Sequence, residues 1–149
     1  MGKEISAEYI AGFFDADGSV GLYLSRTCRK YKTYTVWVNI CQLDPCVLRF
    51  LTERYSGTLR ISKGRGNRRD IWSWKINSKR ALVFLRDIYP HLIGKKEQVR
   101  LVMEFVDLRA KLGLGYANRG RKMDLGSEYD KKIRVLKHES PKTQLPVLQ

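Results

Sequence analysis

The segment from Ile10 to Gly18 reads IAGFFDADG and contains the residues of this chain that could do chemistry. Two aspartates, Asp15 and Asp17, lie close to its end. Apolar residues at helical spacing, followed by a glycine, predict a helix that ends near Asp17. Carboxylates at a helix C-terminus face the negative end of the helix dipole, which costs roughly 0.3–1 kcal/mol each. A bound cation is the simplest reason for Asp15 and Asp17 to occupy this position.

The whole chain carries a strong positive charge. Its 149 residues contain 29 Lys and Arg against 15 Asp and Glu, a formal net charge of +14, and 43% of the residues are hydrophobic. This composition predicts one folded domain and excludes a disordered protein. The charge favours an anionic polymer as partner, with nucleic acid ahead of an acidic membrane surface. No apolar run approaches the ~20 residues of a membrane span, so we expect no membrane partner.

The three cysteines, Cys28, Cys41 and Cys46, fit no zinc-binding spacing. Because the N-terminus also lacks a signal-peptide core, we expect reduced thiols in an intracellular protein. An organelle (chloroplast or mitochondrion) and a prokaryotic cytoplasm are both open as the compartment.

Hydrophobic periodicity alternates between helix and strand along the chain. Period-two runs predict two antiparallel hairpins, with a helix before, between and after them. The expected order is an α+β fold in which helices cover one face of a twisted antiparallel sheet. We expect helices at 6–17, 45–55, 78–88, 94–112 and 124–137, and strands at 19–27, 33–42, 58–62 and 70–77. Residues 1–112 would form the core, and residues 113–149 a basic linker, a C-terminal helix and a tail of the same domain.

One face of the predicted sheet is rich in hydrogen-bonding side chains, and both hairpin loops are basic. A solvated surface explains any single one of these residues, but a two-stranded ribbon also fits the major groove of DNA, where polar side chains reach base edges. Lys and Arg in the loops would bind phosphates. The residues expected to contact DNA from the sheet are Tyr23, Ser25, Thr27, Thr33, Thr35, Trp37, Asn39, Thr58, Arg60 and Ser62. Those expected to contact it from the loops are Arg26, Arg29, Lys30, Lys32, Lys63, Arg65, Arg68 and Arg69.

The last strand has an ambiguous register. Large apolar residues such as Trp74 and Ile76 form its expected core side, which leaves Ser73 and Lys75 facing DNA. A β-bulge would reverse part of this assignment. Asp70, at the start of the strand, is expected at the DNA surface or close to the active site.

The segment from Ile10 to Gly18 resembles the signature of the LAGLIDADG homing endonucleases, with the final Asp-Ala-Asp-Gly intact. The helix and hairpin order resembles the family's fold from about Ser6 to Leu112. The resemblance implies an αββαββα fold with a saddle-shaped antiparallel sheet that lies over DNA, here followed by an extra C-terminal helix.

The same resemblance implies a divalent-metal nuclease site. In the family, the last aspartate of the signature binds Mg²⁺ together with the carbonyl of the preceding residue, here Asp17 and Ala16. Mn²⁺ and Ca²⁺ are alternative occupants, and no small-molecule cofactor is expected. Asp15 lies about 200° around the helix from Asp17 and is expected to serve the helix end or an interface. Gln42 and Lys95 match the family's polar strand-end residue and its active-site lysine, with an ordinary polar group and a surface charge as their alternative roles.

The chain contains one signature, and single-signature members of the family are homodimers. In these proteins the signature helices pack against each other, and Ile10, Gly12, Phe13 and Ala16 are the expected contacts. The leading hypothesis is a homodimeric, Mg²⁺-dependent homing endonuclease that hydrolyses double-stranded DNA at a long pseudo-palindromic target and supports intron mobility. The alternatives are an RNA maturase and a non-cleaving DNA-binding protein of the same fold. A basic ribosomal-type protein would explain the charge but not the two aspartates.

Overall fold

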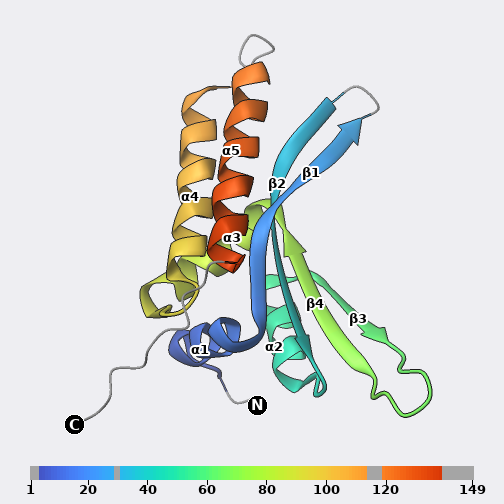
Figure 1. The fold of residues 1–149 in the computed structure, drawn as a ribbon. Helices are drawn as coiled ribbons and strands as arrows, with labels where there is room; N and C mark the ends of the chain where they lie inside the picture. Colours follow the sequence, from blue (N-terminus) through green and yellow to red (C-terminus); the bar gives the residue numbers. More distant parts are fainter. Residues whose placement is uncertain (1–3, 29–30, 114–118, 139–149) are drawn as a thin grey trace.

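The computed structural model describes residues 4–28, 31–113 and 119–138 (Figure 1). Within these ranges a helix precedes, separates and follows two hairpins, as the sequence predicts, and a further helix comes last. In chain order the elements are α1 (Ala7–Asp17), β1 (Gly18–Cys28), β2 (Tyr31–Gln42), α2 (Cys46–Tyr55), β3 (Thr58–Ser62), β4 (Ile71–Asn77), α3 (Ser78–Ile88), the short 3-10 helix η1 (Tyr89–His91), α4 (Lys96–Lys111) and α5 (Arg119–His138).

The four strands form one antiparallel sheet in the order β1-β2-β4-β3. The pairing of β2 with β4 joins the two hairpins and places Gln42 opposite Trp72. In Figure 1 the strands of the two hairpins extend in different directions, so the sheet is strongly twisted and open. The predicted α+β fold with an antiparallel sheet is confirmed.

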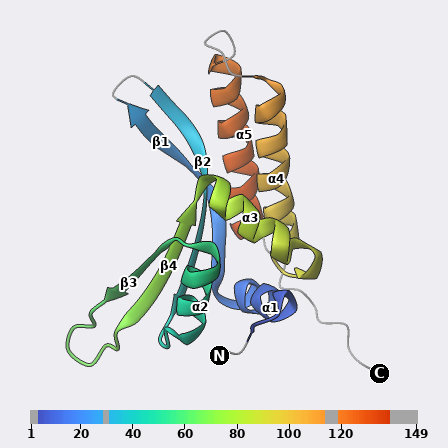
Figure 2. The ribbon, with the colours of Figure 1, turned by 180° about the vertical axis from the view of Figure 1, so that it is seen from behind.

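Alternation along the strands builds the core on one face of this sheet. Every second residue in the central part of the first hairpin is buried, whereas the residues between them face the other way. Helices cover the buried face, and Figure 2 shows α2 and α3 lying across it. The buried strand residues are Val20, Leu22, Val36, Val38 and Ile40 from the first hairpin and Trp74 and Ile76 from the second.

The register of β4 is fixed by Trp74, which is fully buried. Its indole Nε1 donates a hydrogen bond to the Ser56 carbonyl at 2.8 Å, and its ring meets the Phe84 ring edge-on, with 5.2 Å between the centroids. Gly57 has a φ of +97°, and a Cβ there would lie 2.8 Å from Trp74 Nε1, so the turn before β3 requires glycine. The predicted register, with Trp74 inward and Lys75 outward, is confirmed.

The last helix, α5, begins earlier than the expected residue 124 and packs beside α4 (Figure 1). The buried Tyr129 donates a hydrogen bond from its hydroxyl to Glu104 Oε1 at 2.7 Å, which ties α5 to α4. A Cβ at Gly126 would lie 2.2 Å from the Tyr34 ring, so α5 also touches β2 closely. In the described ranges, neither α5 nor any other helix combines the length and the apolar character needed to cross a membrane.

Candidate active site and DNA-facing surface

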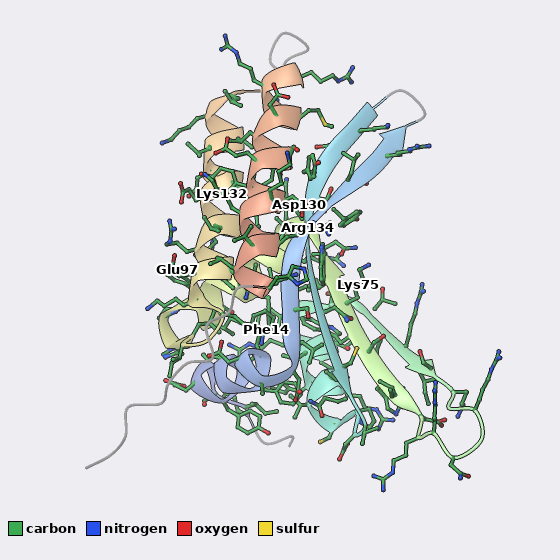
Figure 3. All side chains as sticks on the ribbon, in the orientation of Figure 1. Phe14, Lys75, Glu97, Asp130, Lys132 and Arg134 are labelled. Atoms are coloured by element: carbon green, nitrogen blue, oxygen red, sulfur yellow. The ribbon has the colours of Figure 1, made fainter. Side chains whose placement is uncertain are left out.

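Helix α1 presents its last residue, Asp17, at the start of β1. Ser6 begins the helix by accepting a hydrogen bond from the Tyr9 N–H at 3.3 Å, and the Gly18 N–H ends it by donating to the Phe14 carbonyl. Phe14 is fully buried, and Figure 3 shows it where α1 meets the sheet. A Cβ at Gly18 would lie 2.1 Å from the Phe14 ring, so only glycine fits where the helix turns into the strand. These contacts fix the position of Asp17.

Asp17 and Gln42 meet directly. Gln42 Nε2 donates a hydrogen bond to Asp17 Oδ2 at 2.5 Å. The strand register explains the contact, because Gly18 pairs with Ile40 and β2 therefore runs on past the first residue of β1. This overhang brings Gln42 alongside the end of α1.

Asp15 faces a different element from Asp17. Its carboxylate accepts three backbone hydrogen bonds, from the N–H groups of Ile93 at 2.8 Å, Gly94 at 3.1 Å and Lys95 at 2.8 Å. Lys95 is the N-cap residue of α4, and its own side chain makes no capping hydrogen bond. Asp15 therefore lies at the unfavourable C-terminal end of α1 but also at the favourable N-terminal end of α4. The N-terminus of α4 therefore accounts for the position of the Asp15 carboxylate, for which we expected a bound cation.

The Lys95 side chain lies at the same end of α1. Its Nζ donates a hydrogen bond to the carbonyl of Asp15, whereas Lys96 Nζ lies over an aromatic ring of η1, 5.4 Å from the ring centroid. Of the two neighbouring lysines, Lys95 is thus the one beside the signature helix. The structure gathers Asp17, Gln42 and Lys95 around one helix end, and their catalytic roles stay predictions.

The end of α1 offers oxygen ligands of the kind that Mg²⁺ prefers. Asp17 is exposed, and the last carbonyl groups of a helix, here including that of Ala16, have no partner within the helix. Among the described residues, no group of three or more His, Cys, Asp or Glu side chains could hold a metal by itself. A metal ion at Asp17 and Ala16 would need further oxygen ligands, which water and phosphate can supply. These two residues therefore fit Mg²⁺ without enclosing it.

The predicted DNA-contacting side chains of the strands share the face of the sheet opposite the core. Cross-strand pairs such as Tyr23 with Thr35 and Asn39 with Lys75 follow from the register. Figure 3 shows Lys75 on the side of the sheet away from α5. We call this surface the outer face, and it carries Tyr23, Ser25, Thr33, Thr35, Trp37, Asn39, Thr58, Arg60, Ser62, Ser73 and Lys75.

The tip of the first hairpin differs from the prediction. Strands β1 and β2 continue through Arg26 and Lys32, which lie directly opposite each other. Alternation places these two side chains on the core side of the sheet, so they belong neither to a loop nor to the outer face. Like charges in a cross-strand pair are destabilising, and an anionic partner would relieve the repulsion. Thr27 lies in β1, but its side chain, and Arg29 and Lys30 altogether, lie outside the described residues.

The loop between β3 and β4 is held together by Asp70. Its carboxylate accepts hydrogen bonds from Lys63 Nζ at 2.9 Å and from the Gly64 N–H at 3.0 Å, and these bonds hold the pKa of Asp70 below its usual value. Both oxygens of Asp70 thus brace the loop, and a contact between Asp70 and DNA stays a prediction. The exposed arginines that this loop presents are Arg65, Arg68 and Arg69.

Helix α1 leaves one face uncovered. Gly12 and Ala16 are exposed on it, and Tyr9, which is 55% exposed, stacks on Phe13 with 6.3 Å between the ring centroids. The four residues share one side of the helix by their spacing. The sequence pattern did not single out Tyr9, although its spacing of four residues to Phe13 was available as a signal. Ile10 is fully buried in the core of its own chain, so the expectation that it contacts a second copy is wrong.

Comparisons with known proteins give structural matches alone. No protein-family model matches the sequence, and no curated protein is significantly similar to it. The homing endonuclease I-CvuI, solved with a DNA target in the presence of Mg, matches with a TM-score of 0.68 and 18% identity over 87% of this chain and 80% of its own. The archaeal intron-encoded homing endonuclease I-Vdi141I, solved with DNA, matches with a TM-score of 0.62 and 21% identity over 85% of this chain and 82% of its own.

A longer chain gives a third match. The LAGLIDADG homing endonuclease I-GzeII, solved with its DNA target, has a TM-score of 0.62 and 18% identity over 91% of this chain but 45% of its own. At these identities the likeness concerns the overall architecture. The chain therefore has the LAGLIDADG homing-endonuclease fold.

Proposed function

We propose that this chain is a homodimeric homing endonuclease that hydrolyses double-stranded DNA at a long pseudo-palindromic site with Mg²⁺ and supports intron mobility. The cluster of Asp17, Gln42 and Lys95 at the end of α1 carries the proposal. Structural relatives solved with DNA, one of them intron-encoded, agree with it. A degenerate binding protein of this fold would have no need to keep a carboxylate, an amide and an ammonium group in one cluster.

DNA binding follows from the charge and shape of the outer face. The chain has a net charge of +14, and Arg60 and Lys75 add cations to a surface of hydroxyl and amide groups. The exposed loop arginines between β3 and β4 add further cations at one end of this surface. Phosphates would neutralise the cations, while the strand side chains would contact base edges in the major groove.

The exposed face of α1 supports a dimer. Glycine inside a helix costs about 0.5–1 kcal/mol relative to alanine. Gly12 bears this cost although a Cβ there would meet nothing within 4 Å. Close approach of a second helix gives a reason for glycine at this position, and the Tyr9–Phe13 stack would supply apolar contact area beside it. A two-fold axis at this face would bring the two Asp17 residues together, one for each DNA strand.

The residues at the end of α1 suit phosphodiester hydrolysis. Asp17 and the Ala16 carbonyl would hold the divalent ion, which activates the attacking water and neutralises the leaving oxygen when it is bound. Gln42 orients the Asp17 carboxylate through their hydrogen bond, and its amide oxygen is an acceptor for a water molecule. The Lys95 ammonium group, held by the Asp15 carbonyl, would stabilise negative charge on the phosphate.

Cleavage of a randomised duplex DNA library in Mg²⁺ tests this function. We expect the purified protein to cut both strands of one long, nearly symmetric sequence. An Asp17→Asn variant should bind the same sequence without cutting it. Selection of a duplex that stays intact in both Mg²⁺ and Mn²⁺ would indicate a non-cleaving DNA-binding protein, and binding of structured RNA alone would indicate a maturase.

A further inference from the structure

The outer face contains a hollow of about 440 Å³ that crosses three strands. Its lining combines two aromatic rings, an amide and an ammonium group and includes no carboxylate. The four lining residues are Tyr23 of β1, Trp37 and Asn39 of β2, and Lys75 of β4.

Trp37 forms a preorganised wall of this hollow. It lies opposite Gly21 in the strand register, and a Cβ at Gly21 would be 3.0 Å from Trp37 Nε1, so the ring lies over the bare backbone of β1. Lys137, near the end of α5, places its Nζ 4.8 Å from the centroid of the Trp37 ring. The ring is thus supported by a strand and by a helix that lies outside the two-hairpin core.

Tyr23 and Lys75 form the other side. Lys75 Nζ lies 5.7 Å from the centroid of the Tyr23 ring, which is 36% exposed. Asn39 lies opposite Lys75 and two residues beyond Trp37 along β2, and its amide nitrogen donates a hydrogen bond to Cys41 Sγ at 3.4 Å. The hollow thus combines two aromatic walls with the amide of Asn39 and the ammonium group of Lys75, and Lys137 adds a second cation against the Trp37 ring. This combination is complementary to an apolar group that belongs to a polyanion.

We propose that the hollow recognises thymine through its 5-methyl group, and this proposal rests on the DNA binding proposed above. The thymine methyl is the apolar feature that base pairs display in the major groove, and aromatic side chains contact it favourably. Asn39 supplies the amide that pairs with N6 and N7 of the adenine opposite thymine. The Lys75 ammonium group would bind a phosphate next to that base pair, and the hollow would be a determinant of sequence specificity.

Replacement of thymidine by deoxyuridine tests the proposal, because it removes the methyl group and leaves the base pairing intact. The DNA is the duplex selected from the library, with one thymidine replaced at a time, and binding is measured in Ca²⁺. We expect one thymidine in each half-site at which the replacement weakens binding about fourfold, the effect of losing one buried methyl group. In Trp37→Ala this penalty should disappear at that position.

Two further variants make the result specific. Ile71→Ala removes an apolar side chain that is 45% exposed on the same face but lies outside the hollow, and it should keep the penalty. Tyr23→Ser removes the opposite wall from an exposed position and provides the same test if Trp37→Ala fails to fold. Equal binding of every deoxyuridine duplex by the unmodified protein, or an unchanged penalty in both hollow variants, would overturn the proposal. Failure to select any duplex would instead count against the proposed function itself.

Discussion

Asp15 and Lys95 form two hydrogen bonds with each other, and each bond uses a different pair of groups. The Asp15 carboxylate accepts the Lys95 N–H at 2.8 Å, and Lys95 Nζ donates in return to the Asp15 carbonyl. The first contact caps α4, and the second places an ammonium group beside the end of α1. One carboxylate thus joins the signature helix to the helix that begins with the candidate active-site lysine.

Asp15→Ala should reduce both stability and cleavage. The substitution leaves three N–H groups at the start of α4 without their acceptor, which should lower the free energy of unfolding by about 1–3 kcal/mol. Loss of the position of Lys95 should lower cleavage roughly 10–100-fold, the range for residues that orient an active site without contacting the metal. Urea unfolding and the rate of cleavage of the selected duplex measure the two effects.

Lys95→Ala is the matched control for Asp15→Ala. It keeps the backbone N–H that Asp15 accepts but removes the ammonium group, so cleavage should fall while the unfolding free energy changes little. Equal destabilisation by both substitutions would show that the Lys95 side chain stabilises the fold and does not serve to stabilise charge on the phosphate.

Asp17→Asn should separate DNA binding from cleavage. The amide keeps the size of the side chain and an oxygen that can accept the Gln42 hydrogen bond, but it loses the negative charge that a divalent ion requires. We expect cleavage to fall more than about a hundredfold, which exceeds the range for residues that only orient a metal ligand. The affinity for DNA should be retained. Asp107→Asn, on an exposed position of α4, should change neither quantity. A parallel loss of binding and cleavage in Asp17→Asn would argue against a metal-binding role.

The local parts of this fold follow from the sequence, and the contacts between distant elements do not. Alternation along the strands predicted the outer face, including the inward Trp74 and outward Lys75. The link between Asp15 and Lys95 spans 80 positions and depends on where η1 turns the chain, which no periodicity reports. Ile10 was misplaced because a helical stripe does not tell whether its own chain or a second copy covers it. Arg26 and Lys32 were misplaced because charged residues suggested a loop where the strand pairing continues.

The Tyr129–Glu104 contact predicts a loss of stability at alkaline pH. Burial, together with the hydrogen bond to Glu104, raises the pKa of Tyr129 from 10.0 to about 12. Above pH 10 the unfolded chain releases this proton while the folded chain retains it, so stability should fall as the pH rises from 10 towards 12. Tyr129→Phe cannot ionise and should show a shallower decline of the unfolding free energy over this range.

Tyr55 provides the internal comparison for that measurement. Burial and a hydrogen bond to Asp87 at 2.8 Å raise its pKa to about 12 as well, so part of the alkaline decline should persist in Tyr129→Phe. The double variant with Tyr55→Phe should remove that part too. Superimposable pH profiles for the unmodified protein and Tyr129→Phe would contradict the burial of this hydroxyl between α4 and α5.

Gly12→Ala tests whether a second signature helix packs on α1. Within one chain the added methyl group meets nothing within 4 Å, so alanine should stabilise the helix by about 0.5–1 kcal/mol. In a dimer with closely packed helices the same methyl group would overpack the contact, at a cost of about 1–3 kcal/mol. Sedimentation should therefore show dimerisation weakened by roughly 5- to 150-fold, even though the separate chain becomes harder to unfold.

Gly120→Ala separates helix propensity from packing. Gly120 lies in α5, and a Cβ there also meets nothing within 4 Å, so alanine should strengthen that helix in the same way. Because Gly120 lies away from α1, its substitution should leave dimerisation unchanged. If Gly12→Ala dimerises as tightly as Gly120→Ala, the two α1 helices do not meet at Gly12, and the two Asp17 residues would then need another arrangement to reach both DNA strands.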